Sequence, residues 1–283
     1  MQRTNNGTLY ICGTPVGNLD DITIRALGAL KKSDIIACED TRRTGKLLSH
    51  YGITPRTLIS YHLHSKPGRE EKIINYILEG RNVILVSDAG MPGISDPGFR
   101  LVKKAVDNNI SLTVLPGVSA ITSALAVSGF YADRFVFLGF IDRLSKKERS
   151  ELLNRYGDGE TLVIFVSPYK LLSTLKELQD IYGDCLITIA RELTKKFEEI
   201  RRGSVEEQID FFSENEPRGE FTLVVKPEKR CQDQLIDDHL LKENMQKLEA
   251  AGLKPKEALK AVSVLRDVPR NRLYKLQLEQ SDK

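Results

Sequence analysis

The sequence contains no tryptophan, and its four cysteines are scattered without a CxxC pair. Three of them, Cys12, Cys38 and Cys185, lie in apolar runs, which favours buried and unreactive thiols. Such cysteine usage is typical of a reducing compartment. The first residues, MQRTNNGT, include no apolar segment, so no signal peptide is expected and the predicted location is the cytoplasm.

Both glycine-rich nucleotide signatures are also absent. After the first expected strand the chain reads GTPVGN (13–18), without the G-x-G-x-x-G fingerprint or the GK[ST] ending of a P-loop. Glu39 and Asp40 end the next strand, where a dinucleotide fold places its ribose-binding acid, but without the glycines they are weak support for that function. His62 and His64 have no acidic or cysteine cluster at ligand spacing, so no metal is expected.

Net charge is low, at +3, and by itself indicates no polyanionic partner. Its distribution is more informative, because residues 229–283 hold 12 Lys or Arg against 9 Asp or Glu and so carry the whole excess. The 23 residues from Ile110 to Ala132 have no charge and are long enough to span a bilayer. Pro116-Gly117 and Gly129 interrupt them, however, which favours a strand, a turn and a helix.

Short β-branched runs alternate with helical patterns, which predicts an α/β fold with a largely parallel sheet covered on both faces. The first set of strands is expected at 9–14, 34–40, 58–62, 82–88 and 111–116, with helices at 21–32, 41–51, 69–79 and 99–108. The second set has strands at 135–140, 161–167, 185–192 and 220–225, with helices near 145–156, 169–182 and 204–214. The predicted domains are residues 1–116, 117–228 and a small basic helical domain at 229–283.

Ligands of open parallel sheets bind beyond the carboxyl ends of the strands, so the strand-end loops are expected to meet. The loop from Ser87 to Gly98, SDAGMPGISDPG, is the most unusual of them. Its end fits an ordinary helix start, with Asp96 as the cap and Pro97 in the first turn. Residues 87–93 hold more irregular backbone than a turn requires, and such backbone suits the presentation of N–H and C=O groups to a ligand.

Five of these segments, GTPVGNLDDIT, EDTRRTGKLL, SDAGMPGISDPG, PGVSAITSALAVSG and RELTK, together resemble the tetrapyrrole methylase superfamily, in particular its members that act on ribosomal RNA. The resemblance covers roughly residues 8–227 and continues into the tail. It implies a two-domain class III methyltransferase, usually a homodimer, that binds S-adenosylmethionine between its domains. The implied reaction methylates the ribose 2′-hydroxyl of a decoding-region cytidine in small-subunit ribosomal RNA. VSPYK (166–170) departs from the family's ESPHR-like run, which puts a role of the side chain at position 166 in doubt.

Candidate site residues follow from these loops. The cofactor is expected to contact Pro15, Asp88, Ala89, Gly90, Met91, Ile94, Ser119, Ala120 and Val166. The apolar strand end Phe165-Val166 and its loop are expected to close over the adenine. The catalytic candidates are Asp88, Arg42 and Glu192, although the residues leave the base open among these acids and Asp20, Asp21, Glu39 and Asp40. Asp20 or Asp21 is expected to serve only as the cap of the helix that follows it. RNA contacts are expected from Arg42, Arg43, Lys195, Arg270, Arg272 and Lys275.

Two other functions fit the same residues. A small-molecule methyltransferase acting on corrinoid or tetrapyrrole precursors would share the fold, but it typically has a GxGPGD-like first loop, absent from GTPVGNLDD, and no basic tail. A non-enzymatic RNA-binding protein would keep the fold without the reaction. Saturable binding of S-adenosylmethionine distinguishes an enzyme from that second alternative.

Overall fold

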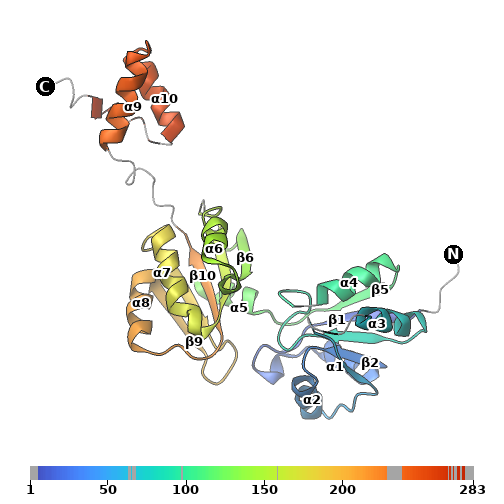
Figure 1. Ribbon diagram of the computed structural model, residues 1–283. Coiled ribbons are helices and arrows are strands. Elements are labelled where there is room, and N and C mark those ends of the chain that lie inside the picture. The colour runs from blue at the N-terminus through green and yellow to red at the C-terminus, as the bar shows by residue number, and fades with distance from the viewer. Residues whose placement is uncertain are drawn as a thin grey trace.

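The computed structural model describes residues 6–62, 65, 68–96, 98–157, 159–227, 238–266, 268, 270, 273–274 and 276–277. Two five-stranded sheets follow one another along the chain, each covered by helices, and a pair of helices comes after them (Figure 1). None of the described helices is long and apolar enough to cross a membrane. The two sheets with their covering helices confirm the predicted α/β class.

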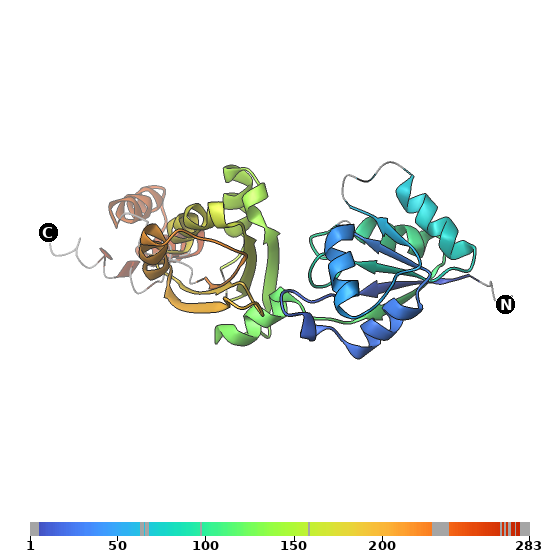
Figure 2. The same cartoon turned by 90° about the horizontal axis from the view of Figure 1, so that it is seen from below.

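The first sheet is entirely parallel, with the strand order β3-β2-β4-β1-β5. Its strands are β1 (Thr8–Cys12), β2 (Ile35–Cys38), β3 (Leu58–Ser60), β4 (Val83–Val86) and β5 (Ser111–Leu115). Helices α1 (Ile24–Lys32) and α2 (Thr41–His50) pack on one face, and α3 (Arg69–Leu78) and α4 (Gly98–Asp107) on the other (Figure 2). The apolar run of β4 is buried throughout because this central strand is covered on both faces.

The start of α1 corrects one expectation. Asp20 and Asp21 do not cap this helix, because they lie in the short 3₁₀ helix η1 (Leu19–Asp21) before it. Thr23 is the cap, and its hydroxyl accepts a hydrogen bond from the Ala26 N–H. The sequence offers Asp and Thr close together, both good capping residues, and only the path of the backbone decides between them.

The second sheet is mixed, with the order β6-β7-β10-β8-β9. Strands β6 (Phe135–Phe140) and β7 (Thr161–Val166) are parallel, whereas β10 (Phe221–Lys226) runs antiparallel to both β7 and β8 (Leu186–Arg191). The edge strand β9 (Glu199–Ser204) pairs antiparallel with β8 and was not predicted. Its sequence EIRRGS is polar and mostly half-buried, so it lacks the apolar run by which the other strands were located.

The helices of this second region are α5 (Ala120–Ser128), α6 (Lys146–Leu153), α7 (Leu171–Tyr182) and α8 (Val205–Glu214), with short 3₁₀ helices η2 (Ile141–Arg143) and η3 (Pro168–Lys170). The uncharged stretch from residue 110 to 132 folds as β5, a turn and α5, as predicted. The three cysteines expected to be inert are buried. Burial raises the pKa of the Cys12 thiol to about 12 and that of Cys38 to about 11.

The tail contains α9 (Asp238–Ala250) and α10 (Pro255–Arg266), which pack on each other around buried Leu241, Met245 and Val262. This agrees with the expected helical C-terminal part. The expected domain limits at 116 and 228 remain predictions. The first sheet ends at Leu115, and residues 228–237 lie outside the described part of the chain.

Candidate functional site

A cavity of about 420 Å³ lies between the two sheets. The carboxyl edge of the first sheet supplies one wall, through Val16, Glu39 and residues 87–91 and 94–96. The second sheet supplies the facing wall, through Phe140, residues 165–168 and residues 219–222. The start of α5 closes the space between them with residues 119–121. The volume is within the range of about 300–1,000 Å³ that is usual for small-molecule sites.

The loop after β4 is tied to the loop after β1. Thr14 and Gly90 exchange two backbone hydrogen bonds, each of 3.0 Å. The Thr14 hydroxyl also donates to the Ser87 carbonyl at 3.1 Å. The loop after β1 also packs closely on the loop after β5, because a β-carbon added to Gly13 would lie only 2.7 Å from the Cα of Gly117. The strand-end loops therefore hold one another in place, as expected for a shared edge.

Three residues of the loop have left-handed backbone: Gly90 at φ +78°, Gly93 at φ +88° and Ser95 at φ +61°. Asp96 then stabilises the start of α4, because its Oδ1 accepts hydrogen bonds from the N–H groups of Gly93 at 2.6 Å and Gly98 at 2.8 Å. The expected capping role of Asp96 is confirmed, and Pro97 lies outside the described residues. Asp96 and most of the irregular part before it line the cavity.

The first turn of α5 borders the same cavity. Ser119 is the N-cap residue, but its side chain makes no capping hydrogen bond. Ser119, Ala120 and Ile121 all line the cavity. A helix start without a side-chain cap leaves backbone N–H groups available and favours an anionic ligand group.

The wall from the second sheet is apolar and aromatic. Phe140 and Phe165 stack at 5.2 Å between ring centroids, and Phe165 also meets Phe137 at 4.9 Å. Val166 ends β7, where it pairs with Phe221 of the antiparallel strand β10. These side chains form a surface suited to a flat organic ring.

Carboxylates gather on the opposite wall. The Asp88 carboxylate accepts the Asp40 N–H at 3.0 Å and forms an ion pair of 3.3 Å with Arg43. Burial raises the pKa of Glu39 and of Asp96 above the ordinary carboxyl value. Within the described residues no group of three or more metal-binding side chains is present. The charge of this wall therefore suits an organic cation.

The cavity brings together eight of the nine residues expected to contact the cofactor, which are Asp88, Ala89, Gly90, Met91, Ile94, Ser119, Ala120 and Val166. Pro15 is not among the lining residues, and its neighbour Val16 is. The cofactor contacts named from the sequence did not include Val16, Ser95, Asp96, Ser167 or Phe140. The apolar strand end Phe165-Val166 was expected to cover the adenine, and it does line the cavity. Phe140 joins it through the pairing of β6 with β7, which the sequence does not state.

Two catalytic candidates lie outside the lining. Arg42 is 87% exposed and its guanidinium pairs with Asp40 at 2.9 Å. Glu192 accepts hydrogen bonds from the Lys195 ammonium and the Glu220 N–H, both at 2.9 Å. Lys195 also pairs with Glu220 at 2.9 Å. These contacts tie the turn after β8 to the start of β10 and occupy Glu192 structurally.

The expected RNA contacts are spread over three places. Arg43 lies beside the cavity through its pair with Asp88, and Lys195 stands in the turn after β8. Arg270 is exposed in the tail, whereas Arg272 and Lys275 lie outside the described residues.

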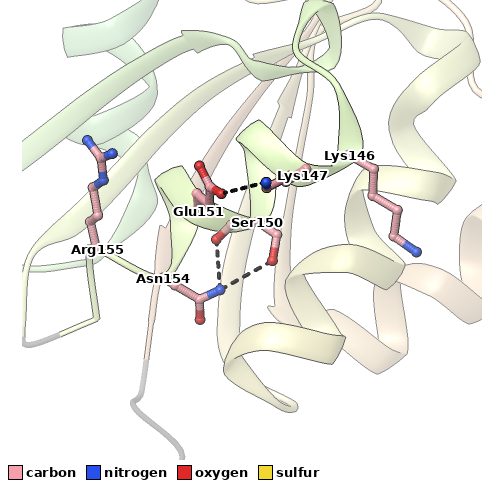
Figure 3. Close-up of a pocket in the computed structure, with 6 residues that line it drawn as sticks. All are labelled: Lys146, Lys147, Ser150, Glu151, Asn154 and Arg155. Atoms are coloured by element: carbon pink, nitrogen blue, oxygen red, sulfur yellow. Dashed lines mark hydrogen bonds and ion pairs between the residues drawn. The ribbon is translucent and has the colours of Figure 1, made fainter.

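A second hollow, of about 800 Å³, lies on α6 and the turn after it (Figure 3). It is lined by Lys146, Lys147, Ser150, Glu151, Asn154 and Arg155. Lys147 pairs with Glu151 at 3.9 Å, and the Asn154 amide donates to the Ser150 carbonyl at 2.7 Å. All the lining comes from one helix and its following turn, so no opposite wall encloses a ligand there.

Comparison with solved structures gives the class of the fold. A cobalamin biosynthetic enzyme, cobalt precorrin-4 methyltransferase, superposes with a TM-score of 0.60 and 18% identity, over 80% of this chain and 97% of that protein. Uroporphyrin-III C-methyl transferase from Thermus thermophilus, complexed with S-adenyl homocysteine, gives 0.57 and 16% over 78% and 97%. The fold is thus that of the class III methyltransferases.

The sequence comparisons are more specific. The family model of tetrapyrrole (corrin/porphyrin) methylases matches residues 8–208. The ribosomal RNA small subunit methyltransferase I of Halalkalibacterium halodurans is 41% identical over 279 residues, which are 98% of this chain and 96% of that protein. The chain belongs to the tetrapyrrole methylase family, in the group of these ribosomal RNA small subunit methyltransferases I. The resemblance drawn from the five loop segments is confirmed.

Proposed function

We propose that this chain is an S-adenosylmethionine-dependent methyltransferase of small-subunit ribosomal RNA, and that its target is the ribose 2′-hydroxyl of a decoding-region cytidine. The observation that carries the proposal is the cavity between the sheets. Its acidic loop wall, its apolar wall and the start of α5 correspond to the three chemical parts of this cofactor. The 41% identity to a ribosomal RNA small subunit methyltransferase I over 98% of the chain supports RNA as the substrate class.

S-adenosylmethionine supplies an electrophilic methyl group on a positively charged sulfur, next to an amino-acid zwitterion and an adenine ring. The uncapped start of α5 at Ser119 suits the carboxylate, because its backbone N–H groups are available. Phe140, Phe165 and Val166 suit the adenine ring. The carbonyl groups and carboxylates between Asp88 and Asp96 suit the positive charge. The residues present therefore fit the cofactor.

Positioning is the main contribution of the protein to such a reaction. Methyl transfer requires the ribose oxygen in line with the methyl group, and good orientation of two reactants contributes about 7–11 kcal/mol to lowering a barrier. The mutual hydrogen bonds of Thr14 and Gly90 keep the first wall rigid. The 2.9 Å hydrogen bond from the Asn18 N–H to the Thr194 hydroxyl fastens that wall to the turn after β8.

Binding of the RNA backbone requires cations outside the cavity. Arg42 and Arg43 begin α2 at its rim, and we assign both to phosphate contacts. In the tail, Lys254, Lys256, Lys260, Arg266 and Arg270 are exposed, and Tyr274 is 55% exposed. Cations interleaved with an aromatic ring suit phosphate contact and base stacking. We therefore assign residues 229–283 to a small RNA-binding domain.

We also propose that the protein works in the cytoplasm as a homodimer. The edge strand β5 leaves Leu112 and Val114 exposed, at 38% and 57%, on the outer side of the first sheet. An exposed apolar edge strand is a surface that proteins usually cover. A second copy of the chain is the occupant that fits the family.

The experiment is a map of methylated riboses. Small ribosomal subunits from cells that lack this protein are incubated with the purified full-length chain and isotope-labelled S-adenosylmethionine, and every 2′-O-methyl group is located in the RNA. We expect one new methyl group, on a cytidine of the decoding region. Labelling of a base, or of no RNA at all, would overturn the proposal. Transfer to a tetrapyrrole precursor in a parallel reaction would favour the small-molecule alternative.

A further inference from the structure

Glu39 is an acid on the wall that the first sheet gives to the cavity. Strand β2 ends at Cys38, and Glu39 follows it at the carboxyl edge of the first sheet. Its neighbour Asp40 turns away to cap α2 by accepting the Arg42 N–H at 2.8 Å. Glu39 instead lines the cavity, on the same wall as Ser87 and Asp88.

The other carboxylates of this wall are already engaged. Asp88 uses one oxygen for the Asp40 N–H and the other for Arg43. Asp88 would therefore have to break a contact in order to take a proton from a substrate. Asp96 holds the N–H groups of Gly93 and Gly98 with a single oxygen, and its second oxygen is buried without a hydrogen-bond partner, so a proton taken there has no direct path to solvent.

Glu220, on the far wall, and Glu192, outside the lining, also hold contacts. Glu192 is bonded to Lys195 and to the Glu220 N–H, and the Glu220 carboxylate pairs with Lys195 at 2.9 Å. The Glu39 carboxylate, in contrast, forms no hydrogen bond or ion pair within the described part of the chain. Among the described acids that line the cavity, it is the one whose carboxylate holds no structural contact.

The surroundings of Glu39 shift its titration toward neutral pH. Burial raises the pKa of Glu39, and the charges of Asp88 and Asp96 raise it further. Arg43 at the start of α2 and His62 after β3 lower it, but by less. A general base works best when its pKa lies near the working pH, and a carboxyl group reaches that range through burial and like charge.

We propose that Glu39 is the general base of the methyl transfer. The ribose 2′-oxygen bonds to the methyl carbon while the carbon–sulfur bond breaks, and the electron pair of that bond stays on sulfur, which becomes a neutral thioether. The hydroxyl proton passes to the Glu39 carboxylate and from there to solvent. The assignment rests on the proposed function, because only an oxygen nucleophile that carries a proton needs a base.

The test compares Glu39→Gln and Glu39→Asp with the unchanged full-length chain on small ribosomal subunits that lack the modification. We expect the Gln variant to lose about 10²- to 10⁴-fold in single-turnover rate, the usual contribution of a general base. The rise of the rate with pH through the Glu39 titration should vanish with it. The Asp variant should keep that pH dependence at a reduced rate. Calorimetry with S-adenosylhomocysteine should give all three chains the same affinity within about threefold.

The matched control is Glu79→Gln, which replaces the 57% exposed carboxylate that follows α3, at the amino edge of the sheet. It should change neither rate nor affinity. A Glu39→Gln variant that keeps the rate and its pH dependence would overturn the assignment. So would a variant whose rate is normal at saturation while cofactor affinity falls more than tenfold, because Glu39 would then be a cofactor ligand. Absence of transfer by the unchanged chain would instead refute the proposed function, and with it the need for a base.

Discussion

The two walls of the cavity are built in different ways. The wall from the first sheet consists of loops, with left-handed residues at Gly90, Gly93 and Ser95, and of carboxylates at strand ends. The wall from the second sheet is built mainly on strand ends, with residues 167–168 and 219–220 beside them, and the side chains of Phe140, Phe165 and Val166 form its apolar surface. The form of the first wall depends on the conformation of its backbone. The form of the second depends on the apolar side chains that cover it.

The sheet topologies explain this difference. In the parallel first sheet every strand delivers its carboxyl end to the same edge, so the residues that follow β1, β2, β4 and β5 reach the cavity. In the second sheet β10 runs antiparallel to β7, so its first residue Phe221 lies opposite the last residue of β7, Val166. The end of β7 and the start of β10 therefore lie side by side at the cavity as paired strand residues. Substitutions in the first wall should act through conformation, and those in the second through lost contact.

Gly90→Val is the strongest test of the first wall. Gly90 has φ +78°, and left-handed backbone costs a residue with a β-carbon roughly 1–2 kcal/mol, more when it is β-branched. Relief of that strain would break both hydrogen bonds to Thr14 and displace the loop. We expect affinity for S-adenosylmethionine to fall more than about 100-fold, equivalent to some 2.7 kcal/mol, while the chain remains folded. Isothermal calorimetry and circular dichroism measure the two effects.

Gly45→Ala is the control for this change. Gly45 lies inside α2, where an added β-carbon meets nothing within 4 Å. Alanine should stabilise the helix by about 0.5–1 kcal/mol and leave cofactor affinity unchanged. If Gly90→Val bound the cofactor normally, the loop would not form part of the site and the contrast between the walls would disappear.

Phe165→Leu tests the second wall and should have a smaller effect. Leucine keeps an apolar contact but removes the ring that packs on Phe137 and Phe140. Aromatic pairs of this kind contribute about 0.5–1.5 kcal/mol beyond their buried area. We expect cofactor affinity to weaken by roughly 3- to 10-fold with a modest loss of stability, because the backbone of β7 does not change.

Phe211→Leu separates these two effects. Phe211 packs on Phe212 at 5.0 Å and against Arg201, and it is not a lining residue of the cavity. The substitution should lower the melting temperature about as much as Phe165→Leu and leave cofactor affinity intact. An equal loss of affinity in both variants would mean that the second wall acts through overall stability.

The same contrast explains what could be predicted from the sequence. The first wall was accessible because Gly, Pro and Asp after the apolar run of β4 mark the chain locally. The second was accessible only in part. The apolar strand end Phe165-Val166 was expected to cover the adenine, whereas Phe140 and Phe221 join it only through the pairing of separate strands. Strand β9 escaped for a related reason, as a polar edge strand has one neighbour and no continuous apolar run. The catalytic choice between Glu39 and Asp88 likewise required the contacts of Arg43 and Asp40.

The smallest predicted effect concerns stability and distinguishes two adjacent acids of the first wall. Burial raises the pKa of Glu39, so the folded chain holds this proton more tightly than the unfolded chain. The resulting stabilisation is complete below the ordinary carboxyl pKa and is lost as pH rises through the raised value. Glu39→Gln should therefore be slightly more stable than the unchanged chain at pH 7, by roughly 1–2 °C in melting temperature, and equal to it in acid.

Asp40 should show the opposite sign. Its hydrogen bonds with the side chain and backbone of Arg42 lower the pKa of Asp40 to about 2, so its contribution is present above the ordinary carboxyl pKa and is lost as pH falls. Asp40→Asn should be less stable than the unchanged chain at pH 7, and the difference should shrink toward pH 2. Thermal melts of Glu39→Gln, Asp40→Asn and the unchanged chain between pH 3 and 8 measure both stability differences. If both variants differed from the unchanged chain in the same direction at pH 7, the charged Glu39 would not be destabilising. A cost to stability is expected of a group that is placed for catalysis.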